Sequence, residues 1–283
     1  MDWETITRLE REGRLPAEVA SPSSGTRVPY IVETILSTGD QHGRFVDETA
    51  WSAVLRILDS VKIDRFVFNG DFVDFYELSR FVKDPDVESS VEEDLTYARR
   101  FLADVRKRLC VGQPIDVVPG NHEKRLELYL RGDARKLSGL KVLELPNLLE
   151  LAKYDATMHQ EDGFELVGTD RPFRVYHGES IRKHAGDSAE QEILAWGCSG
   201  ASQHVHRLAI RRKTTQSGEL LWGEGGCLCL LNPEYMKRRP NWQHGCLLIY
   251  RMSDGSVRME EVRILNGQVQ GTLGMLIGDK VAC

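Results

Sequence analysis

Residues 31–40 read Ile-Val-Glu-Thr-Ile-Leu-Ser-Thr-Gly-Asp, a mostly apolar run that ends in a glycine and an acid. Such a run predicts a buried strand over residues 31–38 with a loop at its carboxyl end. The same pattern, an apolar run followed by glycine and Asp or Asn, recurs in Arg-Phe-Val-Phe-Asn-Gly-Asp at 65–71 and in Ile-Asp-Val-Val-Pro-Gly-Asn at 115–121. These stretches predict further strands over residues 65–68 and 115–118, each running into a loop that contains glycine.

Helical patterns separate these three strands. An apolar pattern from Trp51 to Leu58 follows Asp47, which is suited to cap the helix. Ser90 and Glu93 form a capping box before a second, longer pattern whose apolar residues run through 91–109. The order strand, helix, strand, helix, strand predicts a βαβαβ unit and a largely parallel sheet.

The pattern changes after residue 177. A helix is expected over 189–196, and strands over 207–213, 220–231, 246–252 and 257–264. Asp254-Gly255 predicts a hairpin turn between the last two, and this half therefore favours antiparallel pairing. We expect one α/β domain, a four-layer α-β-β-α sandwich of two mixed sheets, over residues 29–283. A short helix and a linker are expected over residues 1–28.

Composition is that of an ordinary soluble enzyme. The 283 residues are 41% hydrophobic and 28% charged, and the formal net charge of -6 gives no overall attraction to nucleic acid or to an anionic membrane. No apolar run is long enough to span a bilayer, and the charged N-terminus lacks the apolar centre of a signal peptide, so a cytoplasmic location is expected. The six cysteines form no CxxC pair, which favours free thiols over a zinc knuckle.

Potential metal ligands follow the predicted strands. In an open α/β sheet such side chains reach one crevice, because the carboxyl ends of parallel strands share an edge. Carboxylate and imidazole ligands favour Mn, Fe, Zn, Ni or Co over Ca. In an extended segment, the side chains of residues i and i+2 point to the same side, so the two ligands of Asp-x-His or His-x-His can reach the same place. The segments are Asp40-Gln-His42, Gly70-Asp71-Phe-Val-Asp74, Gly120-Asn121-His122-Glu123, His177-Gly178 and His204-Val-His206.

The ordered set D-x-H, G-D-x-x-D, G-N-H-E, H-G and H-x-H resembles the calcineurin-like metallophosphoesterase family. The resemblance implies two divalent metal ions, Mn²⁺ first, and hydrolysis of a phosphate ester by a hydroxide that bridges them. It implies that Asp71 bridges the ions and that His122 donates a proton to the leaving oxygen, oriented by Asp74. A helix cap is the alternative role for Asp74. The remaining ligands implied are Asp40, His42 and His206 for one ion, and Asn121, His177 and His204 for the other.

Residues 177–186 and 226–235 also resemble phosphoesterases encoded by bacteriophages and prophages, which would place the protein in a host cytoplasm. Two positions depart from the family pattern. Gln203 stands where a glycine usually precedes His-x-His, and Phe75 follows Asp74 where the Ser/Thr protein phosphatase branch has Arg-Gly. We therefore do not expect a protein phosphatase of that branch.

Several basic residues lie near the ligands in sequence and are candidates to bind substrate phosphates, with solvated surface charge as the alternative. They are Arg125, Arg182, Lys183, His184 and Arg207. Trp222, Tyr235 and Trp242 could stack on a base or sugar, although packing in the core is favoured for them.

The expected substrate is a nucleotide or nucleic-acid phosphodiester, and the protein is expected to have no membrane partner. Two alternatives remain open. One is a phosphomonoesterase acting on small molecules, and the other is an inactive scaffold with the same fold. The oligomeric state is not indicated by the sequence.

Overall fold

A computed structural model describes residues 28–80, 82–83, 88–232 and 240–271. Contacts divide the chain into two units, Met1–Tyr30 and Ile31–Cys283, and every element below belongs to the second. The helix and linker expected over residues 1–28 lie, except for Val28, outside the described residues. The boundary expected at residue 29 stays a prediction.

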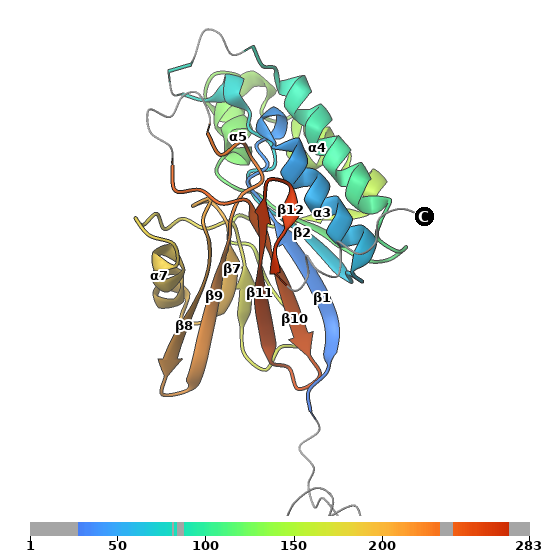
Figure 1. Ribbon diagram of the computed structural model, residues 1–283. Helices are drawn as coiled ribbons and strands as arrows, with labels where there is room; N and C mark the ends of the chain where they lie inside the picture. The colour runs from blue at the N-terminus through green and yellow to red at the C-terminus, as the bar shows by residue number, and fades with distance from the viewer. Residues whose placement is uncertain (1–27, 81, 84–87, 233–239, 272–283) are drawn as a thin grey trace, which may run out of the picture. The chain divides into compact units, whose positions relative to one another are not determined.

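The larger of two mixed sheets has seven strands in the order β12-β11-β10-β1-β2-β3-β4 (Figure 1). Strands β1 to β4 run parallel, and β10 pairs antiparallel with β1, so that Ile35 lies between Ile249 and Arg65. The three strands predicted in the first half are confirmed. The bounds are β1 (Ile31–Thr38), β2 (Arg65–Asn69), β3 (Ile115–Val118), β4 (Ala156–Met158), β10 (Gly245–Met252), β11 (Val257–Leu265) and β12 (Gln268–Val269).

The smaller sheet has five strands in the order β5-β6-β7-β9-β8. The prediction of antiparallel pairing is wrong for β6, β7 and β9, which run parallel, and correct for the β8–β9 and β10–β11 pairs. A helix between β6 and β7 makes a crossover, and a crossover joins parallel strands. The strand expected over 220–231 ends at Gly225. The bounds are β5 (Phe164–Glu165), β6 (Phe173–Val175), β7 (Ser199–Ser202), β8 (Leu208–Thr215) and β9 (Gly218–Gly225).

The helices form outer layers, with α3 and α4 on the larger sheet and α7 beside β8 and β9 (Figure 1). The predicted cap at Asp47 is confirmed, since it accepts from the N–H groups of Thr49 and Ala50. Of the predicted capping box, Ser90 accepts from the N–H of Glu93, whereas the Glu93 side chain pairs with Arg44. The α-helices are α3 (Glu48–Ser60), α4 (Val91–Arg106), α5 (Glu123–Arg131), α6 (Leu145–Leu148) and α7 (Asp187–Trp196). The 3-10 helices are η1 (Gly43–Phe45), η2 (Tyr76–Leu78), η3 (Arg135–Leu137), η4 (Lys141–Leu143) and η5 (Leu151–Tyr154).

Alternation along the strands builds two apolar layers. Leu36 and Phe66 belong to the layer beneath α3 and α4, whereas Ile35, Val67 and Trp222 belong to the layer shared by the two sheets. The fold is thus the predicted α/β sandwich, and Trp222 packs in its core as favoured. In the described part of the chain, no helix has the length and apolar character needed to cross a membrane.

Candidate metal centre

The loops that carry the candidate ligands follow five strands. Three of these strands, β1, β2 and β3, are parallel neighbours in the larger sheet, so their carboxyl ends share one edge. The other two, β6 and β7, are parallel neighbours in the smaller sheet. Side-chain contacts link all seven predicted ligands: Asp40, His42, Asp71, Asn121, His177, His204 and His206.

One part of the centre surrounds His177. Its Nδ1 donates to the carbonyl oxygen of Asn69 at 2.9 Å, so the Nε2 of the neutral ring carries a lone pair. That Nε2 lies 3.2 Å from Asp71 Oδ2 and 3.2 Å from Asn121 Oδ1. A ring nitrogen of His204 lies within 4.8 Å of the same Asp71 and His177 atoms. In the neutral form of His177 that can bind a metal, atoms that accept but do not donate converge here, which is an arrangement that a cation completes.

The other part surrounds His42 and His206, whose Nε2 atoms face each other at 3.2 Å. Asp40 Oδ1 lies 3.2 Å from His206 Nε2 and 3.7 Å from His42 Nε2. This oxygen is buried and accepts no well-oriented hydrogen bond from any described residue. His42 Nδ1 donates to Asp74 Oδ2 at 3.0 Å, which leaves the Nε2 lone pair of the neutral ring for the centre. This donor set also fits a divalent cation.

Asp71 joins the two parts. Its carboxylate lies within 4.8 Å of ring nitrogens of His42 and His122 on one side and of His177 and His204 on the other. Asp71 Oδ1 also accepts from the backbone N–H of His122 at 2.8 Å, so the carboxylate is held in place by the neighbouring loop. A position between the two clusters is where a shared ligand belongs.

Buried charges reinforce this arrangement. Burial would raise the pKa of Asp71, but His122 and His177 reverse that effect and hold its pKa well below the usual range. The same balance, with His206 as the main partner, lowers the pKa of Asp40. Although burial opposes protonation, Asp71 raises the pKa of His177 to about 9. Both carboxylates are ionised at neutral pH and draw positive charge into the centre.

Backbone strain is concentrated in the ligand loops. Five predicted ligands have left-handed φ angles between 50° and 71°, a region that non-glycine residues occupy at a cost of about 1 kcal/mol or more each. Gly70, with φ 87°, lies against the ring of His177, where a Cβ would collide. The strained ligands are Asp40, His42, Asp71, His204 and His206.

Asp74 lies between two histidines. Its Oδ2 is 3.0 Å from His42 Nδ1 and 3.1 Å from His122 Nδ1, so the predicted pairing with His122 is present and a second, with His42, was not predicted. Arg125 donates to Asp74 Oδ1 at 3.0 Å and to His122 Nε2 at 3.0 Å. Because a guanidinium only donates, His122 Nε2 accepts here, and the neutral ring carries its proton on Nδ1.

Glu123 is a residue of the centre that sequence reasoning quoted but gave no role. It is 3% exposed, and its Oε2 accepts from the N–H groups of Gly120 and Asp71 at 2.7 and 2.9 Å. Its Oε1 accepts from Phe72 and Val73 at 3.0 and 3.1 Å. One carboxylate therefore ties the loop after β3 to the loop after β2. Its place in the G-N-H-E motif was the available signal.

Cys229 and Trp242 also contact the centre through His206. Cys229 Sγ lies 3.8 Å from His206 Nδ1, and burial raises the pKa of this thiol well above its ordinary value. Trp242 packs edge-on against the His206 ring, with centroids 4.2 Å apart. The thiol was not selected from the sequence because no CxxC or Cys-His spacing marks it, and Tyr235 lies outside the described residues.

Of the other basic candidates, Arg182, Lys183 and His184 lie on the loop that leads to α7, whereas Arg207 lies between β7 and β8. Arg182 donates to Gln191 at 3.1 Å, and Arg207 donates to the carbonyl oxygen of Arg182. The side chain of His184 is exposed, as is that of Lys183. Their binding of substrate phosphate stays a prediction, whereas Arg125 is engaged by the centre itself.

Gln203 fits because its neighbours are glycines. It is 1% exposed, and a Cβ on Gly39 or Gly225 would collide with its side chain. Its backbone N–H donates to the carbonyl oxygen of His177 at 2.7 Å. The departure at position 203 is thus absorbed without displacing the histidines that follow it.

Comparisons with known proteins bear on this centre. The sequence model of the calcineurin-like phosphoesterase family matches residues 33–229. No curated protein matches the chain. Solved structures that resemble it include vacuolar protein sorting 29 from Cryptosporidium parvum, with 13% identity, 85% of this chain and 96% of that chain covered, and a TM-score of 0.43. Vps29 from Chaetomium thermophilum has 10% identity, 82% and 97% coverage, and a TM-score of 0.42. Wild-type Vps29 from Entamoeba histolytica, complexed with Zn²⁺, has 13% identity, 81% and 98% coverage, and a TM-score of 0.39.

Proposed function

We propose, because the chain belongs to the calcineurin-like phosphoesterase family, that it hydrolyses a phosphate ester with two bound divalent metal ions. The observation that carries the proposal is the pair of acceptor clusters joined by Asp71. In each cluster, buried imidazole nitrogens and carboxylate oxygens face one another at the carboxyl ends of the strands. A divalent cation can bind both kinds of atom at once.

The proposed ligand sets follow the two clusters. Mn²⁺ is the first choice of metal, with Fe, Zn, Ni and Co also suited to oxygen and nitrogen ligands. When bound, the ions lower the pKa of a coordinated water and neutralise charge that develops on the phosphate oxygens. Asp40, His42 and His206 would hold one ion, Asn121, His177 and His204 the other, and Asp71 both.

Asp74 and Arg125 determine which ring nitrogens of His42 and His122 carry protons. Asp74 keeps the protons of His42 and His122 on Nδ1, so that both Nε2 atoms are available to the centre. His122 is the proposed donor to the leaving oxygen, but Arg125 bonds its Nε2 in the free protein. A substrate phosphate competes for this guanidinium. Nε2 can then take a proton from solvent and pass it to the leaving oxygen, which returns the ring to its neutral form with the proton on Nδ1.

The proposed substrate is a nucleotide-type phosphodiester. Its support is the resemblance of residues 177–186 and 226–235 to phosphoesterases of bacteriophages and prophages. A phosphomonoester of a small molecule is the alternative substrate. An inactive scaffold is the remaining alternative, and the filled ligand positions weigh against it.

Hydrolysis of bis-p-nitrophenyl phosphate and p-nitrophenyl phosphate tests the proposal. We expect release of p-nitrophenolate with Mn²⁺, none with a chelator, and a loss of at least about 100-fold in kcat for Asp71→Asn. The exposed Asp133→Asn serves as the matched control and should keep wild-type activity. Faster turnover of the monoester would favour the alternative substrate. Absence of turnover for both esters, with folded protein and bound metal, would favour the scaffold.

A further inference from the structure

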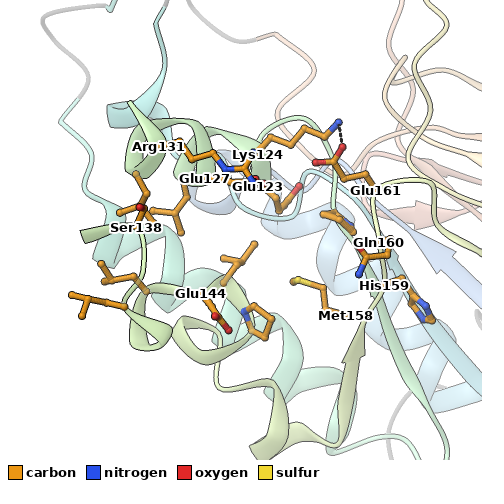
Figure 2. Close-up of a pocket in the computed structure, with 17 residues that line it drawn as sticks. Glu123, Lys124, Glu127, Arg131, Ser138, Glu144, Met158, His159, Gln160 and Glu161 are labelled. Carbon is orange, nitrogen blue, oxygen red and sulfur yellow. Dashed lines mark ion pairs between the residues drawn. The ribbon is translucent and has the colours of Figure 1, made fainter. Parts of the chain in front are cut away.

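A pocket lies next to the candidate metal centre, at the carboxyl end of β4 (Figure 2). β4 extends the parallel row of β1, β2 and β3. The loops after the first three strands carry candidate ligands, whereas the loop after β4, residues 159–161, forms one wall of the pocket. α5 and the segment from η3 to α6 form the other walls. The pocket therefore occupies the next position along the edge at which the fold gathers its ligands.

The pocket has an apolar interior and a rim of mostly paired charges. Its volume is about 510 Å³, which lies in the range of small-molecule sites. Four glutamates and two basic residues line it, and two of the glutamates form ion pairs with the basic residues, Glu127 with Arg131 and Glu161 with Lys124. The apolar lining comprises Leu126, Leu130, Leu140, Leu143, Leu145 and Met158.

An ion pair stands between this pocket and the metal centre. A second cavity, of about 230 Å³, is lined by Asn121, His177 and His204. It shares Lys124 and Glu161 with the larger pocket. Lys124 Nζ lies 2.6 Å from the Glu161 carboxylate, the pair drawn as a dashed line in Figure 2. The pair is partly exposed, at 34% and 52%, so separating it takes little free energy.

We propose that this pocket binds the nucleoside group of a small phosphodiester whose phosphate lies at the metal centre. The inference rests on the proposed function and narrows its substrate class. The apolar interior suits a base and a sugar, and rim groups such as Ser138 and Gln160 offer hydrogen bonds to them.

Two esters with the same leaving group test the inference. Thymidine 5′-(p-nitrophenyl) phosphate presents a nucleoside and methyl p-nitrophenyl phosphate does not, and both release p-nitrophenolate. Leu140→Trp fills the pocket from a side chain that is 48% exposed, so the core is left intact. Val142→Trp is the matched control, since Val142 lies in η4, directly after its N-cap Leu140 and Lys141, is 66% exposed, and does not line the pocket.

The quantity compared is kcat/KM for the thymidine ester divided by kcat/KM for the methyl ester. We expect Leu140→Trp to lower this ratio about tenfold, and Val142→Trp to leave it within about twofold of the wild-type value. An unchanged ratio in Leu140→Trp would overturn the inference. If neither ester is hydrolysed by the wild type with Mn²⁺, the proposed function fails instead.

Binding without metal supplies a second readout. Thymidine added to chelator-treated protein should shift the ¹H–¹⁵N signals of Leu140, Met158 and Gln160, and Leu140→Trp should abolish the shifts at Met158 and Gln160. Absence of thymidine shifts in the wild type would overturn the inference.

Discussion

Replacement of Glu123 by glutamine should loosen the whole metal centre. The wild-type carboxylate accepts four backbone N–H groups from two loops, two at each oxygen. Glutamine keeps one oxygen and turns an NH₂ group toward the other two donors. Two buried N–H groups then lose their acceptor, at about 1–3 kcal/mol each. Removing the buried charge, whose pKa is raised from 4.5 to about 7, returns about 3 kcal/mol, so the free energy of unfolding should fall by up to about 3 kcal/mol.

Urea unfolding at pH 8 measures this loss. That pH lies above the value of about 7 to which burial raises the pKa of Glu123, so the wild-type group is ionised. Glu127→Gln on the same helix is the control, because Glu127 is exposed and pairs only with Arg131 among the described residues; it should change stability by less than about 0.5 kcal/mol. A higher midpoint for Glu123→Gln than for wild type would refute the view that this carboxylate holds the two loops together.

Asp74→Asn should lower kcat about 10- to 100-fold with unchanged circular dichroism, because both histidines that share this carboxylate lose their orientation. Gly70→Ala should abolish Mn²⁺ retention, since its Cβ collides with His177, whereas Gly112→Ala, at a similar φ with open space, should cost about 1 kcal/mol and retain metal. Burial, reinforced by the charge of Asp74, raises the pKa of Asp94 to about 7. An acid whose pKa is higher in the folded protein stabilises it fully below the ordinary value of 3.8, and this contribution is lost as pH rises through 7. The free energy of unfolding of Asp94→Asn should therefore exceed that of wild type by about 2–4 kcal/mol between pH 5 and 8, as measured from urea midpoints.

The parallel strands and the seven candidate ligands could be predicted because their signals are local. Each strand is a short apolar run, and each run leads directly into a loop with Asp, Asn or His beside glycine. The caps at Asp47 and Ser90 are local for the same reason, since their partners lie within three residues. Parallel pairing then brings the loops together without further information.

Features that depend on distant partners could not be predicted. β9 lies between β7 and β8, so its parallel neighbour is set by sheet packing and not by a turn. The bond of Asp74 to His42 spans 32 residues, and the bonds of Glu123 to the loop after β2 span about 50. The left-handed φ angles of the ligands are likewise imposed by the loops around them, because Asp and His do not favour this region on their own.

The number of metal ions retained per chain tests the central claim most directly. Protein dialysed against a low concentration of Mn²⁺ is analysed for metal by mass spectrometry, alongside Asp71→Asn and the control Asp133→Asn. Two ions per chain in wild type and control, with both weakened in Asp71→Asn, are the predicted result. No retained metal in the wild type, or full retention in Asp71→Asn, would contradict a centre in which one buried carboxylate joins two cation sites.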